Sequence, residues 1–92
     1  MARVVVTFRI MPKGIDVDLH KLEALSKKEI EHFTGPTEFK SSIQPIAFGL
    51  KALEILFVMD ESKGSTEKLE QKIVHIADVE SVEVTDVRRA IG

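Results

Sequence analysis

The sequence predicts a small α+β fold in which four antiparallel strands form one sheet and two helices cover one face of it. Strand-like and helix-like segments follow one another in the order strand, helix, strand, strand, helix, strand. Glycine and proline residues mark several of the boundaries between these segments. The chain has 92 residues, of which 43% are hydrophobic. A chain of this size is expected to form one domain over residues 1–92, with only shallow sites on its surface.

The first strand is expected in the segment RVVVTFRIM, residues 3–11. Its residues alternate between an apolar face and a mixed face, which is the period of a half-buried strand. The apolar face contains Val4, Val6, Phe8 and Ile10, and the mixed face contains Val5, Thr7, Arg9 and Met11. Pro12 and Gly14 end the strand.

The first helix is expected from Asp18 to Phe33, and Gly35 and Pro36 end it. Its apolar residues recur at helical spacing and are Leu19, Leu22, Leu25, Ile30 and Phe33. Asp16 and Asp18 precede this run, where an aspartate caps free backbone amides. Two carboxylates are too few for a typical divalent-ion site, so capping is the expected role.

The polar face of this helix is expected to be solvated. Glu23 and Lys27 are four residues apart, which predicts a weak ion pair in solvent and gives no sign of a recognition helix. His20, His32 and His75 are too scattered to bring two imidazole rings to one metal ion, so no metal site is expected.

Two strands follow the first helix. The segment TEFKSSIQ, residues 37–44, is only weakly strand-like and precedes Pro45, which cannot donate to a ladder, so it is expected at an edge of the sheet. The segment from Lys51 to Met59 is expected to be central because both of its faces carry apolar residues. One face contains Leu53, Ile55, Phe57 and Met59, and the other contains Leu56 and Val58.

A charged loop, DESKGSTEK, comes next and leads into a short second helix marked by Leu69, Ile73 and Ile76. Ser65 or Thr66 is expected to cap this helix. The order Lys63-Gly64-Ser65-Thr66 differs from that of a phosphate-binding loop, so no nucleotide site is expected here. The segment VESVEVTDV, residues 79–87, predicts the last strand. The whole order is that of a ferredoxin-like fold.

Composition excludes several functions known for such folds. The net charge of −2 gives no overall positive field for nucleic acid, and the absence of Tyr and Trp argues against base stacking as in an RNA-recognition module. The chain has no cysteine, which excludes a copper chaperone, and no asparagine, which excludes an acylphosphatase-like enzyme. Absence of cysteine also fits the reducing cytoplasm, and the N-terminal segment reads as a strand, with no export signal.

The segment PIAFGLKAL, Pro45 to Leu53, resembles the pattern P-I/V-G-F/Y-G-I-K-K-L of the archaeal elongation factor 1-beta family and of the guanine-exchange domain of the eukaryotic factor. The loop and helix MDESKGSTEKLEQKI follow at the family's distance. The opening IMP…DVDL and the ending VEVTDVRR are also similar, so the resemblance covers nearly the whole chain. Ala47 and Ala52 depart from the pattern, which affects only a contact from a second lysine at position 52.

The resemblance implies that the protein releases GDP from elongation factor 1-alpha without making or breaking a covalent bond. It implies partner-binding roles for Ile46, Phe48, Gly49, Lys51 and Lys63, with Lys63 also acting in the exchange step at the magnesium site of the GTPase. No cofactor, metal, nucleotide site, direct nucleic-acid contact, membrane contact or small-molecule substrate is implied. From the residues alone, Ile46 and Phe48 fit either a partner contact or packing on the sheet edge.

One alternative from another functional class fits the same fold. A ferredoxin-like regulatory module would bind a small ligand on the open face of the sheet or at a homodimer interface. Such a module would not need the uncharged segment 45–50 together with a basic loop, which favours the exchange factor.

Overall fold

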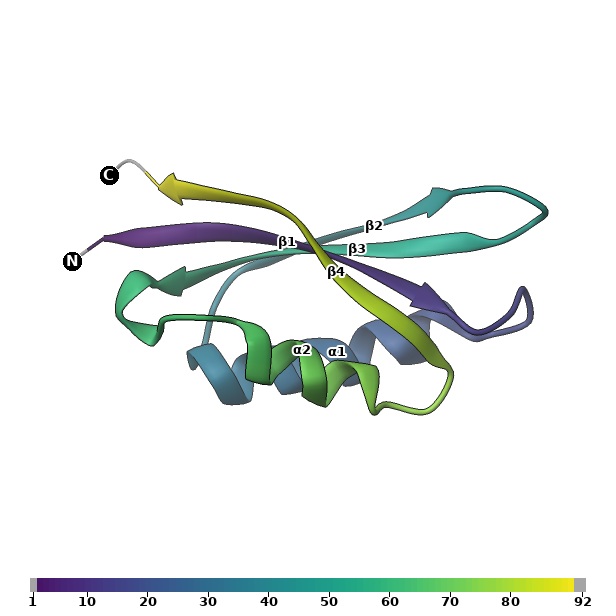
Figure 1. Ribbon diagram of the computed structural model, residues 1–92, viewed down its shortest axis with the longest axis horizontal. Helices are drawn as coiled ribbons and strands as arrows, with labels where there is room; N and C mark the ends of the chain where they lie inside the picture. Colours follow the sequence, from purple (N-terminus) through teal and green to yellow (C-terminus); the bar gives the residue numbers. More distant parts are fainter. Residues whose placement is uncertain (1, 91–92) are drawn as a thin grey trace.

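The computed structural model describes residues 2–90 and contains the six expected elements in the expected order (Figure 1). One short 3₁₀ helix, η1, is added after the third strand. The elements are β1 (Arg3–Pro12), α1 (Leu19–Thr34), β2 (Phe39–Pro45), β3 (Lys51–Asp60), η1 (Glu61–Lys63), α2 (Glu67–Val74) and β4 (Val79–Ala90). The strands form one antiparallel sheet in the order β2-β3-β1-β4, and both helices cover the same face of it. The predicted α+β, ferredoxin-like fold is therefore confirmed.

The hydrophobic core lies between the sheet and the two helices. It includes the face of β1 that alternation predicted and the matching face of β3, because Val6 pairs with Phe57 and Phe8 pairs with Ile55. The rings of Phe8 and Phe57 meet edge to face, with centroids 5.0 Å apart. β3 is central and β2 is an edge strand, as expected.

The helix α1 begins at a capped turn. The Asp18 carboxylate accepts hydrogen bonds from the backbone N–H groups of His20 and Lys21, at 3.1 and 3.3 Å, so the expected capping role of Asp18 is confirmed. One expected core contact is wrong, because Leu25 is 39% exposed while Ser26 is buried. Both residues lie about one turn after Leu22, and the rotation of the helix against the sheet decides which of them faces inward.

The Glu23–Lys27 pair is more buried, and has more hydrogen bonds, than the weak ion pair expected in solvent. The Glu23 carboxylate accepts hydrogen bonds from Lys27 Nζ at 2.6 Å and from Ser41 Oγ of β2 at 2.7 Å, and both charged side chains are partly buried. The cluster thus links α1 to the edge strand. These hydrogen bonds lower the pKa of Glu23 below its usual value, with the bond from Lys27 as the largest cause.

We expect Glu23→Gln to lower the free energy of unfolding by about 1 kcal/mol at pH 7, because it removes the charge from two hydrogen bonds. A carboxylate with a lowered pKa stabilises the fold above its unfolded-state pKa and loses this effect as pH falls through its folded-state value. The difference between variant and wild type should therefore shrink as pH falls through the lowered folded-state pKa of Glu23. Urea unfolding across a series of acidic pH values measures it, and a constant difference would contradict the role of the charge.

The elements in the second half of the chain are close to those predicted from the sequence. Thr66 is the N-cap residue of α2, but its side chain forms no capping bond and its hydroxyl instead donates to the Glu70 carboxylate at 2.8 Å. The Ser65 hydroxyl, one residue earlier, accepts a hydrogen bond from the N–H of Glu67 at 3.1 Å. Ile76 lies just beyond α2 but still packs against the core, and β4 extends to Ala90, past the expected end. Within residues 2–90, neither helix is long and apolar enough to span a membrane.

Candidate functional site

The hairpin between β2 and β3 contains most of the expected partner-binding residues. The last β-pair joins Pro45 to Lys51, and the loop between them is closed by two backbone hydrogen bonds of 2.9 Å, from Ile46 N–H to the Leu50 carbonyl and from Leu50 N–H to the Ala47 carbonyl. The two central residues of the inner turn both have positive φ, as in type I′ turns. Backbone hydrogen bonds therefore define the shape of the hairpin tip.

Phe48 occupies the first central position of this turn with a φ of 54° and is 98% exposed. A positive φ is uncommon for a bulky residue and costs free energy, whereas Gly49, next to it with a φ of 79°, adopts it readily. Ile46 is also exposed, at 42%. The structure therefore rules out the reading in which Phe48 folds onto the sheet edge, and Ile46 is only partly covered.

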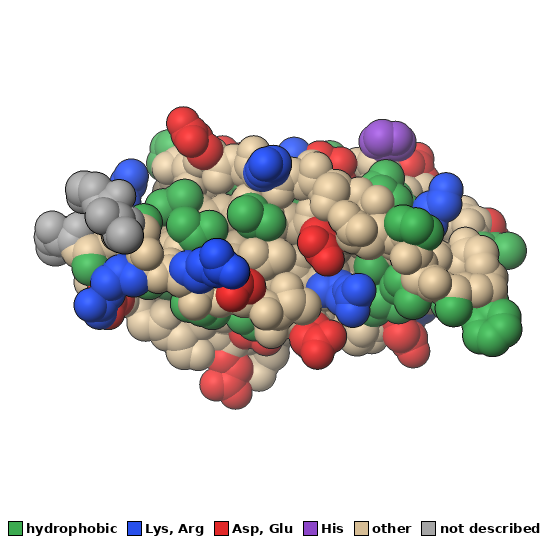
Figure 2. All heavy atoms as spheres, turned by 90° about the horizontal axis from the view of Figure 1, so that it is seen from above, with side chains coloured by type: hydrophobic (Ala, Val, Ile, Leu, Met, Phe, Trp, Pro, Cys, Tyr) green, Lys and Arg blue, Asp and Glu red, His purple; other side chains and the backbone are tan. Residues whose placement is uncertain are grey.

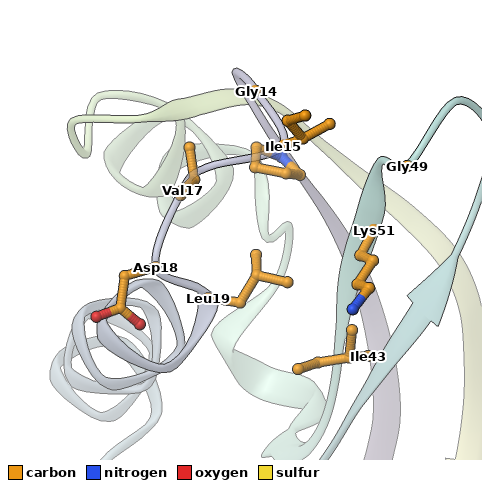
Figure 3. A pocket seen from close by; sticks show the side chains of 9 residues that line it. Gly14, Ile15, Val17, Asp18, Leu19, Ile43, Gly49 and Lys51 are labelled. Atoms are coloured by element: carbon orange, nitrogen blue, oxygen red, sulfur yellow. The ribbon is translucent and has the colours of Figure 1, made fainter.

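A cleft lies between this hairpin and the loop that joins β1 to α1 (Figure 3). It has a volume of about 330 Å³ and is open to solvent. Five of its nine lining residues are apolar, and the Lys51 side chain runs along the cleft toward Ile43. The nine lining residues are Pro12, Gly14, Ile15, Val17, Asp18, Leu19, Ile43, Gly49 and Lys51.

Apolar side chains gather at the hairpin end of the molecule, at the right of Figure 2. Ile15, Ile43, Ile46 and Phe48 are all exposed there, and Ile15 is the second most exposed, at 71%. Exposed apolar groups close together on a small domain are typical of an interaction surface. We call these four residues the hairpin-end surface.

Lys63 lies in the short segment after β3. Its loop is held at two points: the Glu61 N–H donates to the carbonyl of Ala2, just before β1, at 3.0 Å, and the Glu61 carboxylate accepts from Arg89 of β4 at 2.8 Å. Two hydrogen bonds from Ser62, of which the backbone one is the larger cause, lower the pKa of Asp60. Among the described residues Lys63 itself forms no ion pair, so an exposed ammonium stands on an anchored loop.

The hairpin-end surface and Lys63 lie at opposite ends of the molecule (Figure 1). The ten residues of β3 separate them, and a strand of this length spans roughly 30 Å. Ile46, Phe48, Gly49 and Lys51 are therefore brought together, while Lys63 is far from all of them. A partner that contacts both ends must reach along most of the 42 Å length of the domain.

Sequence reasoning did not identify Ile15 as part of any site. It is a single apolar residue in the turn segment KGIDVD, where neither strand nor helical periodicity applies. Only the fold, which places this loop beside the hairpin, brings it near Gly49. Among residues 2–90, no three His, Asp or Glu side chains gather in a way that would hold a metal ion.

Two solved structures share the fold at low sequence identity. The de novo designed protein Foldit4 matches with a TM-score of 0.61 and 19% identity, and 98% of each chain is covered. The structure named BlrP1 BLUF matches with a TM-score of 0.56 and 16% identity, over 100% of this chain and 57% of the other. These similarities support the fold alone.

Proteins with related sequences include elongation factors. The chain is 43% identical to elongation factor 1-beta of Methanobrevibacter smithii and 44% identical to that of Methanothermobacter thermautotrophicus, in each case over 97% of this chain and 98% of the relative. It is 37% identical to the protein of the same name from Methanococcoides burtonii, over 99% and 100%. The family described as EF-1 guanine nucleotide exchange domain matches residues 5–90. The chain therefore belongs to the EF-1 guanine nucleotide exchange domain family.

Proposed function

We propose that this protein binds elongation factor 1-alpha and accelerates the release of GDP from it, so that GTP can rebind. Membership of the exchange-domain family supports nucleotide exchange as the activity. The observation that carries the docking proposal is Phe48, which is almost fully exposed in a turn whose backbone is strained. Strained residues with exposed aromatic side chains are commonly functional.

The hairpin tip is the proposed anchor. Phe48 and Ile46 would enter apolar depressions on the GTPase, and the hydrogen-bonded turn would present them without a further ordering cost. Gly49 allows the turn to form, and Lys51 would supply a positive charge at its base. This division of roles fits an interface with a small apolar centre and a polar rim.

The Lys63 loop is the proposed exchange element. The GTPase holds GDP partly through Mg²⁺, which bridges a protein hydroxyl and the phosphates. An ammonium on a long stem can approach the oxygens that face this metal without gripping the phosphate as Mg²⁺ does. The tie between Glu61 and Arg89 would keep the loop in place while Lys63 reaches outward. No covalent bond is made or broken in this mechanism.

The two ends of the domain would therefore have separate tasks. Phe48 lies roughly 30 Å from Lys63, so one residue would dock while the other weakens nucleotide binding. A thousandfold faster release of GDP requires a barrier lower by about 4 kcal/mol. Loss of metal coordination together with distortion of the nucleotide-binding loops could supply this amount, whereas one lysine contact alone would not.

We expect Lys63→Ala to lower the stimulated rate of GDP release at least tenfold while binding to the GTPase changes little. The side chain is exposed and forms no ion pair with residues 2–90, so the melting temperature should stay within the range of a surface substitution. Release of fluorescent GDP from elongation factor 1-alpha, followed in excess GTP, measures the rate.

Lys72→Ala is the matched control, because it removes an exposed lysine of α2 that has no place in the proposed contact. The control should exchange nucleotide at the wild-type rate. A folded Lys63→Ala variant that also does so would remove Lys63 from the mechanism.

A further inference from the structure

We propose that the cleft between the β1–α1 loop and the β2–β3 hairpin is a second docking point, which receives an apolar side chain of the GTPase flanked by a carboxylate. Ile15 and Lys51 would be the residues that select this partner group. The inference rests on the proposed function, because it extends the contact of the hairpin to a loop that lies far away in the sequence.

The geometry joins the loop to the hairpin as one surface. The Ile15 side chain lies beside the turn, such that a Cβ atom built on Gly49 would be 3.7 Å from Ile15 Cγ2. Ile15 nevertheless remains 71% exposed. It therefore forms a wall of the cleft without being part of the core, and it continues the hairpin-end surface beyond Phe48 and Ile46.

Aliphatic side chains line opposite sides of the cleft. Val17 and Leu19 are partly buried against the core, and Ile43 of β2 lies across from them in Figure 3. A volume of about 330 Å³ exceeds what one aliphatic side chain needs, so such a side chain can enter from the open side. These aliphatic side chains favour contact with an apolar group, and the polar atoms beside them favour a polar group next to it.

The charged residues of the cleft indicate which group of the GTPase should lie beside the apolar side chain. Two ionisable side chains line it, Lys51 and Asp18. The Asp18 carboxylate turns toward its own helix, where its Oδ1 atom accepts both capping hydrogen bonds. Lys51 forms no ion pair with any residue in the range 2–90. The unmatched positive charge fits a carboxylate beside the apolar group of the partner.

The test measures binding to nucleotide-free elongation factor 1-alpha by calorimetry. We expect Ile15→Ala to weaken binding about tenfold, from the loss of buried methyl groups. We expect Lys51→Gln to weaken it about fivefold and to reduce the dependence of affinity on salt. Melting temperatures of both variants should match the wild type, because both side chains are exposed.

Matched controls are Val87→Ala, which truncates an exposed apolar residue of β4, and Lys72→Gln, which removes an exposed charge of α2. Both should bind normally. If Phe48→Ala weakens binding while Ile15→Ala or Lys51→Gln binds normally, the cleft proposal is wrong and the proposed function stands. If the wild-type chain does not bind the GTPase at all, the proposed function itself fails.

Sedimentation of the chain alone tests whether a second copy of the chain occupies the cleft in place of the GTPase. The proposal expects no concentration-dependent association that depends on Ile15. Self-association that Ile15→Ala abolishes, with GTPase binding unaffected, would assign the cleft to a second copy of the chain and overturn the proposal.

Discussion

Phe57→Ala is expected to lower the free energy of unfolding by about 3–5 kcal/mol, which is the usual cost of truncating a core phenylalanine. Phe57 is 1% exposed and its ring packs against that of Phe8. It also lies on β3, which pairs with both β1 and β2, so the cavity would form where three strands meet. Thermal unfolding should show a melting temperature lower by roughly 15 °C or more for a domain of this size.

Phe48→Ala provides the matched control for this measurement, since the same truncation is made on a side chain that is 98% exposed. Alanine keeps a Cβ atom, so the strain of the positive φ remains in the variant. Its melting temperature should be nearly that of the wild type. Equal stability of the Phe57 and Phe48 variants would mean that the buried and open faces of β3 are exchanged.

The same Phe48→Ala variant is expected to weaken binding to nucleotide-free elongation factor 1-alpha by about 2 kcal/mol, the scale of an interface hot spot. This corresponds to roughly a 30-fold higher Kd. The loss should arise because the largest exposed apolar side chain at the hairpin tip is gone. Calorimetric titration of the folded variant measures it directly.

The Lys63→Ala variant separates docking from release in this titration. It should bind nearly as well as the wild type and fail mainly in nucleotide displacement, because the two residues lie at opposite ends of the domain. Distant substitutions of this kind are expected to be additive in a double variant. Wild-type binding by Phe48→Ala would contradict the proposed anchor.

Alternation and helical spacing were sufficient to predict the fold. Side chains alternate strictly between the two faces of a strand, so β1 can bury only one of two sets of residues. The apolar set, which includes Val6 and Phe8, is the one that faces inward. Asp18 and Pro45 were equally informative. Asp18 predicted the start of a helix and Pro45 predicted an edge strand, because helix capping and a missing backbone donor act locally. Leu25 was assigned wrongly because residues three and four positions after Leu22 both suit the inner face of a helix.

The candidate site was less accessible from sequence because it depends on neighbours that are distant along the chain. The resemblance pointed to Phe48, but its exposure depends on a turn with two successive positive φ angles. Ile15 reaches Gly49 only because the β1–α1 loop lies beside the hairpin, and the pattern KGIDVD gives no sign of this. Likewise, Glu23 meets Ser41 only through the packing of α1 on β2.

We propose that this chain is an exchange factor for elongation factor 1-alpha, and this claim can be tested at substoichiometric amounts. One part of the chain is mixed with about twenty parts of GTPase loaded with fluorescent GDP, in excess GTP. An exchange factor acts repeatedly, so we expect all of the bound GDP to be released, at a rate proportional to the amount of the chain. Release at the intrinsic rate of the GTPase, or of only one GDP per chain, would contradict the claim.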